Sequence, residues 1–245
     1  MSKTVVSIII ATFNSGKTLR SALDSILSQK YREWECIVVD GASNDDTIEI
    51  VKEYCVIDSR FRYISEKDHG IYDAFNKGWR MAKGEWIHYL GDDDRLTSNG
   101  IECLMSVPEL DNYEIVSGHC YIEKIDGSVK ANRSHGFYGC HQGKLTRRST
   151  LEHFGGFDER YKILADKDLM LRMENAGVKI VNVDAFVAYF SMTGMSQSMS
   201  GLWKRTKELH KIDVENRISH PIIKSVRYFC LTVLSISYRK VRGLL

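Results

Sequence analysis

The chain has 245 residues, a length that suits one well-buried α/β domain with a decorated C-terminal part and is too short for two full domains. Its formal net charge is only +2, and no basic run interleaved with aromatic residues occurs, so we expect no nucleic-acid partner. No segment reaches the roughly 20 apolar residues that a membrane-spanning helix needs. The apolar start, residues 1–11, is typical of a first strand rather than a signal peptide, which predicts a cytoplasmic protein.

Six cysteines are scattered along the chain without a C-x-x-C pair, a pattern that favours reduced, packed thiols. Two adjacent pairs, His119-Cys120 and Cys140-His141, offer zinc ligands. Neighbours on a strand point to opposite faces, however, so we expect no zinc site there.

The first half of the chain alternates short β-branched runs with amphipathic helical stretches. This is the pattern of βαβ units, which build a sheet with helices on its faces. In chain order, the pattern predicts strands at 5–11, 35–40, 61–65 and 85–90, and helices at 19–27, 45–55 and 71–83. We expect Ser43 or Asn44 to cap the second helix.

The second half of the chain changes to an antiparallel pattern. A strand at 115–125, a turn at Asp126-Gly127 and a return strand from Val129 predict a hairpin. A helix at 168–176, ended by Gly177, precedes strands at 178–183 and 185–190. Together the two halves predict an α/β fold, with a mostly parallel central sheet, helices on both faces and a smaller antiparallel region.

Three consecutive carboxylates, Asp92-Asp93-Asp94, follow the predicted strand at 85–90. Ligands collect at the carboxyl ends of strands in open α/β sheets. Like charges this close repel, and their oxygen atoms suit Mg²⁺ or Mn²⁺, which would bridge a diphosphate. The alternative is a solvated turn that caps a helix over 96–104.

Three further acidic residues stand at strand or helix ends. Asp40 ends the second predicted strand, where it could accept hydrogen bonds from a base or ribose. Asp166 and Asp168 precede a helix, and a carboxylate near a metal-bound diphosphate could act as a general base. For each of the three, the alternative is a helix cap.

Residues 11–18 (ATFNSGKT) match the spacing of a phosphate-binding P-loop, except that Ala11 replaces its first glycine. A P-loop NTPase or kinase is therefore the alternative function. Ala11 introduces a Cβ where the phosphate-wrapping turn favours glycine. This alternative also leaves the aspartate triplet unexplained.

Taken together, these motifs resemble family 2 glycosyltransferases of the GT-A fold, over about residues 5–205. Residues 7–14 look like the opening strand and nucleotide loop of that family, and residues 38–47 like its second nucleotide contact. Residues 65–78 (SEKDHGIYDAFNKG) are similar to a stretch typical of bacterial surface-polysaccharide members. The acceptor half of that subgroup is matched by segments at 140–142, 147–148, 155–159 and 166–172.

The resemblance assigns roles to individual residues. Asp166 falls where the family keeps its catalytic base, but many members have Glu-Asp where this chain has Ala165-Asp166, so Asp168 is the alternative base. For His141, the alternative to an acceptor contact is a core histidine bonded to a backbone carbonyl. The implied donor contacts are Thr12, Asn14, Asp40, Asp68, Lys77, Asp92 and Asp93; the implied metal ligands are Asp93 and Asp94; the implied acceptor contacts are His141, Gln142 and Asp168.

The resemblance also implies a reaction. It implies that one sugar passes with inversion from a UDP- or GDP-sugar to a hydroxyl of a lipid-linked glycan in bacterial cell-surface polysaccharide biosynthesis, with Mn²⁺ or Mg²⁺ as cofactor. The chain lacks a Q-x-x-R-W motif, which argues against a processive synthase. A catalytically dead binding module is a third class, but such a copy should have lost carboxylates that this chain retains.

We expect a glycosyltransferase domain at 1–215, divided into a nucleotide-sugar half (1–110) and an acceptor half (111–215). The tail, 216–245, carries Lys224, Arg227, Arg239, Lys240 and Arg242 around an apolar run. A basic amphipathic helix there could lie on the inner face of an anionic cell membrane. The alternative is a helix that packs on the core or on a second subunit.

Overall fold

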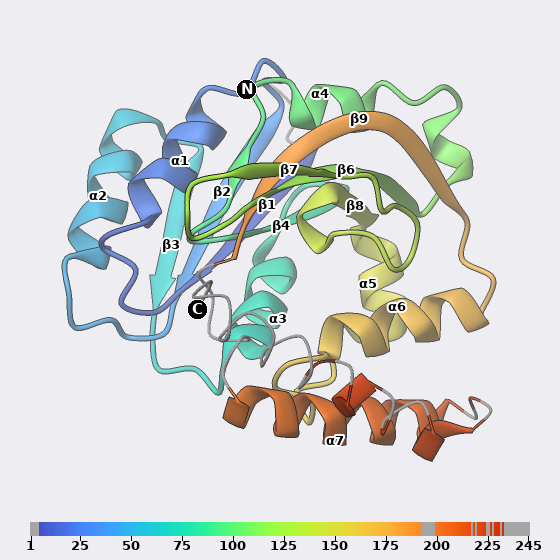
Figure 1. Cartoon of the computed structure of the whole chain (residues 1–245). Coiled ribbons are helices and arrows are strands. Elements are labelled where there is room, and N and C mark those ends of the chain that lie inside the picture. The colour runs from blue at the N-terminus through green and yellow to red at the C-terminus, as the bar shows by residue number, and fades with distance from the viewer. Residues whose placement is uncertain are drawn as a thin grey trace.

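A nine-stranded sheet runs through the centre of the molecule (Figure 1). The computed structural model describes residues 5–192 and 199–216, together with 218, 220–223, 226, 228–230 and 232. The strands lie in the order β3-β2-β1-β4-β8-β6-β9-β5, and β7 pairs with β6 outside this path. The predicted α/β fold with a mostly parallel central sheet is confirmed.

The N-terminal half forms the parallel part of the sheet, as predicted. Its strands are β1 (Val6–Thr12), β2 (Trp34–Asp40), β3 (Phe61–Ser65) and β4 (Trp86–Gly91), and its first three helices are α1 (Leu19–Leu27), α2 (Thr47–Ile57) and α3 (Ile71–Met81). Each begins and ends within about two residues of its predicted bounds, which is the usual uncertainty of an element end.

Two local predictions in this half are wrong. The N-cap of α2 is Asp46, because the Ser43 hydroxyl instead bonds to Asp40 and to the Asn14 amide. The helix over 96–104, which belonged to the alternative interpretation of the aspartate triplet, is instead a two-residue strand, β5 (Arg95–Leu96), followed by a shorter helix, α4 (Gly100–Met105).

The sheet separates two hydrophobic cores, because successive side chains of a strand point to opposite faces. On β1, Ile8 and Ile10 pack with α1, α2 and α4, whereas Ile9 and Ala11 pack with α3, α5 (Arg148–Phe154) and α6 (Ala165–Asn175). Gly78 lets α3 approach the sheet closely, since a Cβ there would lie 2.3 Å from Cγ2 of Ile9.

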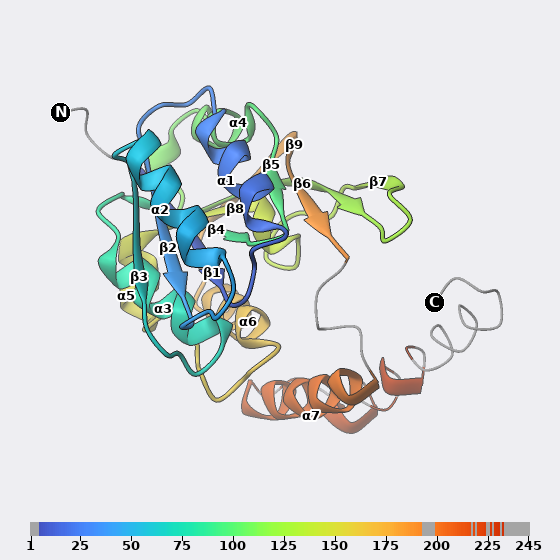
Figure 2. The same ribbon diagram turned by 90° about the vertical axis from the view of Figure 1, so that its left-hand side faces the viewer.

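The C-terminal half adds strands of mixed direction. β6 (Ile115–Glu123) pairs antiparallel with β7 (Val129–Asn132) and with β8 (Lys144–Arg147), and β8 joins this half to β4. β9 (Ile180–Ser191) runs parallel to β6. Figure 2 shows the β6–β7 hairpin extending away from the parallel half of the sheet.

The structure corrects the predicted elements here in two places. The two strands expected at 178–183 and 185–190 are one strand, β9; its pairing with β6 is irregular opposite residues 117–120, so the strand continues past the polar Asp184. The helix expected at 168–176 is α6 (Ala165–Asn175), which begins three residues earlier and has Asp166 in its first turn. The pattern did not predict β8, α5 or α7 (Met199–Glu215).

The C-terminal region lies beside α6 and α3 (Figure 1). Ile212 of α7 belongs to the same core as α3 and α6. The basic residues predicted to form a membrane-binding tail, Lys224, Arg227, Arg239, Lys240 and Arg242, lie outside the described residues. In the part of the chain that is described, no helix is long and apolar enough to cross a membrane. The boundaries predicted at 110 and 215 stay predictions.

Candidate active site

The backbone N–H groups of the loop after β1 donate their hydrogen bonds to other parts of the protein. Three consecutive amides donate to side chains of the segment that follows β2. The pairs are Asn14 to Ser43 Oγ (2.8 Å), Ser15 to Thr47 Oγ1 (2.8 Å) and Gly16 to Asp45 Oδ2 (3.0 Å). A P-loop needs such amides for phosphate oxygens. The P-loop interpretation is therefore wrong, and Lys17 is an exposed loop side chain.

Asp40 is fully buried at the end of β2, and the protein itself fills its hydrogen-bonding capacity. Its carboxylate accepts hydrogen bonds from Thr12 Oγ1 (3.1 Å), Ser43 N (3.0 Å), Ser43 Oγ and Ser65 Oγ (2.7 Å). Four donors match the roughly four acceptor positions of a carboxylate. Asp40 and Thr12, both predicted to contact the donor, thus tie together the ends of β1, β2 and β3.

An exposed aromatic ring and a carboxylate meet over Gly41, next to this buried cluster. A Cβ on Gly41 would lie 2.7 Å from Asp68 Oδ2 and 3.3 Å from Cδ2 of Phe13. The Phe13 side chain is 61% exposed, and Asp68 is half-buried with Oδ1 accepting from Gly70 N (2.9 Å). Sequence reasoning did not single out Phe13, although a large apolar residue inside a polar loop is a usable signal.

Two other predicted donor contacts have partners within the chain. Lys77 pairs with Glu66 (2.8 Å) and Asp73 (3.4 Å), and it thereby holds the segment before α3. Asn14 adopts a positive φ of 53°, and its side-chain oxygen accepts from Asn44 N (2.8 Å). Both residues shape the loops around Gly41.

Asp94 is buried at the end of β4, and both of its carboxylate oxygens accept hydrogen bonds from the protein. Oδ1 accepts from Ser191 N (2.8 Å), and Oδ2 accepts from Gln142 Nε2 (2.7 Å) and Gly91 N (3.2 Å). Burial raises the pKa of Asp94 to about 7, against the lowering effect of the Ser191 amide. In this structure Asp94 and Gln142 join β4, β9 and the turn at 141–143; the metal-ligand role of Asp94 and the acceptor contact of Gln142 stay predictions.

Asp92 and Asp93 precede it and are half-buried. Burial raises the pKa of Asp92, the Ser15 hydroxyl lowers it, and the neighbouring Asp93 raises it. Adjacent, partly desolvated carboxylates are hard oxygen donors that suit Mg²⁺ or Mn²⁺. Among the residues that the structure describes, no group of three His, Cys, Asp or Glu side chains could hold a metal ion. The pair therefore fits a cation whose remaining ligands come from a substrate or water.

His141 lies in an aromatic cluster and not at an open surface. Its ring centroid is 5.2 Å from that of Tyr89, 5.9 Å from Phe157 and 6.1 Å from Phe75. Burial, with a smaller effect from Lys144, lowers its pKa to about 3. Nε2 is buried without a hydrogen-bond partner in the described part of the chain. The ring is thus neutral and packed in the core, and the acceptor contact predicted for His141 stays a prediction.

Lys144 is a buried lysine that the sequence did not reveal as special. Its ammonium donates to the carbonyl oxygens of Phe137 (2.9 Å) and Gly139 (2.7 Å). Burial lowers its pKa to about 8, and the nearby Asp166 opposes this shift. Lys144 therefore fixes the 137–139 loop beside the start of α6.

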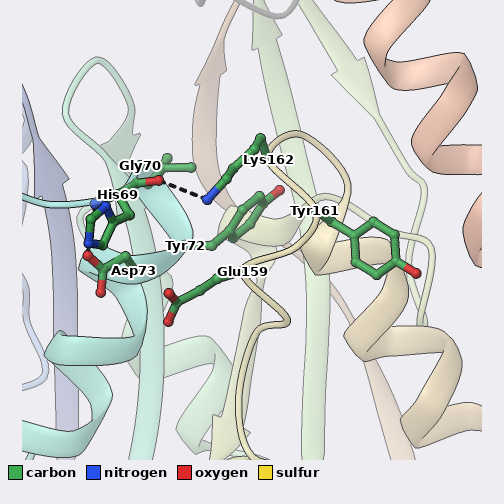
Figure 3. A pocket seen from close by; sticks show the side chains of 8 residues that line it. His69, Gly70, Tyr72, Asp73, Glu159, Tyr161 and Lys162 are labelled. Carbon is green, nitrogen blue, oxygen red and sulfur yellow. Dashed lines mark hydrogen bonds between the residues drawn. The ribbon is translucent and has the colours of Figure 1, made fainter.

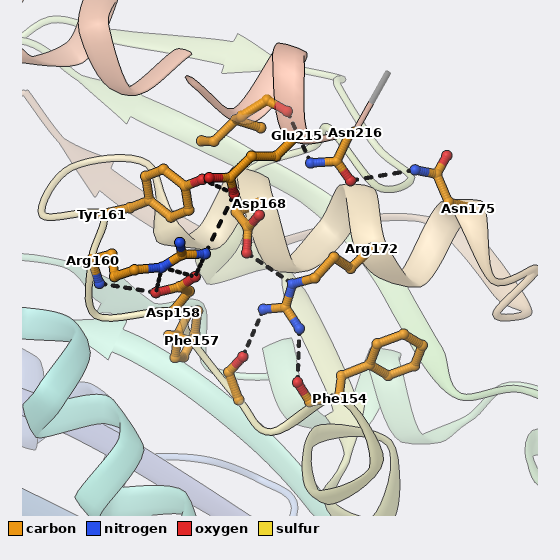
Figure 4. Close-up of polar contacts among 12 residues, drawn as sticks. Phe154, Phe157, Asp158, Arg160, Tyr161, Asp168, Arg172, Asn175, Glu215 and Asn216 are labelled. Carbon is orange, nitrogen blue, oxygen red and sulfur yellow. Dashed lines mark hydrogen bonds and ion pairs between the residues drawn. The ribbon is translucent and has the colours of Figure 1, made fainter. Parts of the chain in front are cut away.

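Asp166 and Asp168 occupy different environments although only one residue separates them. Asp166 is half-buried in the first turn of α6, and its Oδ1 accepts a hydrogen bond from the Tyr72 hydroxyl (3.0 Å). Asp168 is buried and pairs with Arg172 (2.8 Å), which also donates to the carbonyls of Phe154 and Gly156 (Figure 4). Asp168 stabilises the α5–α6 connection, and Asp166 is the more accessible carboxylate.

A family model described as "Glycosyl transferase family 2" matches residues 7–174 of the chain, more than half of its length. The chain belongs to glycosyl transferase family 2. It is therefore a glycosyltransferase, and β1 to α6, which hold the residues described above, fall within the matched region.

Similar curated proteins are named as glycosyltransferases. The "PGL/p-HBAD biosynthesis glycosyltransferase" of Mycobacterium tuberculosis is 31% identical over 180 residues, which cover 70% of each chain. The "GalNAc(5)-diNAcBac-PP-undecaprenol beta-1,3-glucosyltransferase" of Campylobacter jejuni is 36% identical over 121 residues, 49% of this chain and 39% of that protein.

Solved structures share the fold of this family 2 glycosyltransferase. TarS 1–349 of S. aureus, in complex with UDP-GlcNAc, has a TM-score of 0.69 at 19% identity and matches 86% of this chain and 66% of its own. The mannosyltransferase PcManGT of Pyrobaculum calidifontis, in complex with GDP-Man and Mn²⁺, has a TM-score of 0.68 at 17% identity, over 100% of this chain and 77% of its own.

Proposed function

We propose that this family 2 glycosyltransferase transfers one sugar, with inversion, from a UDP- or GDP-sugar to a hydroxyl of a lipid-linked glycan in cell-surface polysaccharide biosynthesis. One observation carries the proposal: the half-buried pair Asp92-Asp93 directly follows β4, and the neighbouring 141–144 segment bonds to Asp94 through Gln142 and brings Lys144 near the half-buried Asp166. The complexes of the two structural relatives with UDP-GlcNAc and with GDP-Man and Mn²⁺ support a nucleotide-sugar donor.

The nucleoside would bind at Gly41, between Phe13 and Asp68. The exposed Phe13 ring offers a face to the base, and base–aromatic stacking contributes about 1–3 kcal/mol per base. Asp68 can accept hydrogen bonds from the ring N–H of uracil or guanine. Asp40 and Thr12 would form the rigid floor beneath, with Asn14 and Lys77 shaping the rim.

Asp93, assisted by Asp92, would hold the divalent cation against the donor diphosphate. The cation would neutralise charge on the departing nucleoside diphosphate. Asp94 would keep this pair in place through its bonds to Ser191 and Gln142, not by binding the ion.

Asp166 would act as the general base toward the acceptor. Its carboxylate takes the proton of the acceptor hydroxyl while that oxygen bonds to the anomeric carbon. The bond from that carbon to the diphosphate breaks in the same step, so no sugar–enzyme bond forms and the anomeric configuration inverts. The neutral packed His141 and the buried Asp168 would support the acceptor side without touching it.

We also propose contact with a membrane surface, where lipid-linked acceptors are found. Support comes from the Campylobacter relative, a glucosyltransferase whose name includes an undecaprenol-linked glycan, and from basic and apolar residues exposed on α7 and the segment after it.

Isothermal titration with a panel of UDP-, GDP- and dTDP-sugars, with Mn²⁺ or with chelator, tests the donor site. We expect one donor class to bind in Mn²⁺ only, and Asp93→Asn to weaken that binding by at least about tenfold, the loss of roughly 1.4 kcal/mol. Asp126→Asn, a matched change in the exposed β6–β7 turn, should bind like wild type.

If no nucleotide sugar binds, the donor proposal fails. If a donor binds equally well without Mn²⁺ and in Asp93→Asn, the proposed donor stands but the proposed metal site is wrong.

A further inference from the structure

The Tyr72 hydroxyl reaches from α3 to the start of α6. It lies 3.0 Å from Asp166 Oδ1 and 2.8 Å from the Ile163 carbonyl oxygen, so its one proton is shared between two acceptors. Burial and the neighbouring Asp166 carboxylate both raise the Tyr72 pKa well above its usual value. Tyr72 is therefore a permanent O–H donor to the carboxylate.

The Tyr72 ring is itself fixed by packing. It contacts Phe157 and Phe75, with ring centroids 5.2 and 6.4 Å away. A small cavity of about 40 Å³ borders it, between the start of α3 and the 159–162 loop (Figure 3). Lys162 closes part of this region by donating to the His69 carbonyl (3.0 Å). The hydroxyl therefore has one well-defined position.

The segment before Asp166 is also held from the opposite side by α7. Glu208 accepts hydrogen bonds from three consecutive amides, Lys162 N (2.8 Å), Ile163 N (2.9 Å) and Leu164 N (2.9 Å). These three residues lead directly into α6. Backbone motion at the start of α6 is thus restricted, and Tyr72 restricts the remaining freedom, the rotation of the Asp166 side chain.

We infer that Tyr72 is a positioning residue for the catalytic base: its hydroxyl holds the Asp166 carboxylate in the orientation that receives the acceptor proton. The inference rests on the proposed role of Asp166. A carboxylate free to rotate spends part of its time out of reach of that proton, and small displacements of a catalytic group can cost up to about 10²-fold in rate. A tyrosine that served only the core would affect stability alone.

Tyr72→Phe separates these two roles, because it removes the hydroxyl and keeps the packed ring. With the donor sugar found by titration, we expect hydrolytic kcat to fall roughly tenfold or more while KM for the donor changes less than about twofold. Tyr161→Phe is the matched control: the Tyr161 hydroxyl also bonds a carboxylate, Glu215 at 2.7 Å, but not the proposed base (Figure 4). It should leave kcat unchanged.

A conservative replacement guards against an unfolding artefact. Incorporation of 3-fluorotyrosine at position 72 retains the O–H donor, and we expect it to restore kcat to within about twofold of wild type. Melting temperatures of all variants are measured alongside.

The outcomes distinguish the inference from the function on which it rests. If Asp166→Ala turns over donor like wild type, the base assignment itself is wrong. If Asp166→Ala loses turnover but Tyr72→Phe loses no more than Tyr161→Phe, the positioning role of Tyr72 is overturned. A fall in melting temperature without a fall in kcat overturns it too.

Discussion

At the scale of single residues, several ionisable side chains around the site are buried, and burial shifts their pKa values. His88 on β4 is fully buried, and its Nδ1 lies 3.0 Å from the Lys144 carbonyl oxygen. Burial lowers the pKa of His88 to about 4 and that of His141 to about 3. Both rings are therefore neutral in the folded protein near neutral pH, and each must take up a proton when the chain unfolds in acid.

This difference predicts acid sensitivity. Between about pH 6.5 and 4 the unfolded chain binds the His88 proton and the folded chain does not, so the free energy of unfolding should fall as pH falls through this window. His88→Gln should reduce the slope by roughly 1.4 kcal/mol per pH unit, the value of one proton. Urea unfolding at several pH values, with chelator present, measures this slope of the unfolding free energy against pH.

Two comparisons make that measurement specific. His153→Gln alters an exposed histidine and should leave the slope as it is in wild type. Asp94, with its pKa raised to about 7, acts in the opposite direction, because the folded state holds that proton and loses this stabilisation as pH rises. The difference between variants, and not the wild-type slope alone, therefore carries the test; equal slopes for His88→Gln and wild type would refute it.

At the scale of elements, the hydrophobic pattern of the sequence predicted the strands and helices whose positions depend mainly on that pattern. The strands β1 to β4 and helices α1 to α3 follow the hydrophobic period closely, and their predicted bounds were nearly right. Strand β8, Lys144–Arg147, has no such pattern; it forms because β4 and β6 pair with it from both sides. The polar Asp184 interrupts the apolar pattern of β9 where its pairing with β6 is also irregular, yet the strand continues to Ser191.

The same distinction applies to the site. Asp92, Asp93 and Asp166 could be proposed from sequence because they end or begin an element. Tyr72 and Glu208 could not, since their roles depend on partners 94 residues ahead and about 45 residues behind in the chain.

One face of helix α7 is basic, and its charge predicts binding to an anionic surface. Lys204, Lys207 and Lys211 are exposed and spaced so that they share one side of the helix. Trp203 beside them is 53% exposed, and the following segment exposes Ile222, Ile223 and Val226. Basic and large apolar side chains together favour an anionic membrane surface.

Co-sedimentation with phosphatidylglycerol vesicles tests this face. Replacing the three lysines of α7 by glutamine should reduce binding by about 1 kcal/mol for each charge removed, and added salt should weaken wild-type binding. A variant with glutamine at Lys30, Lys52 and Lys83 removes the same charge from exposed positions elsewhere and should bind like wild type. Equal loss in both variants, or no vesicle binding at all, would remove the membrane surface from the proposal.

At the scale of the whole molecule, one sheet connects the proposed donor and acceptor regions. β4 carries Asp92 and Asp93 at its end, β8 and the turn before it carry Lys144 and Gln142, and α6 carries Asp166. The fold class and the family could be recognised from ordered motifs along the chain. The aromatic enclosure of His141 could not, because it is assembled from β4, α3 and the loop before α6.

We propose that Asp166 removes the acceptor proton while a cation at Asp93 holds the donor. The most direct test of this proposal is donor turnover, measured as nucleoside diphosphate release in Mn²⁺, by wild type, Asp166→Asn and Asp168→Asn. We expect Asp166→Asn to bind the donor normally and to lose about 10²- to 10⁴-fold in turnover. Asp168→Asn should unfold at a lower temperature but keep most of its turnover. Near-normal turnover in Asp166→Asn, with loss in Asp168→Asn, would contradict it.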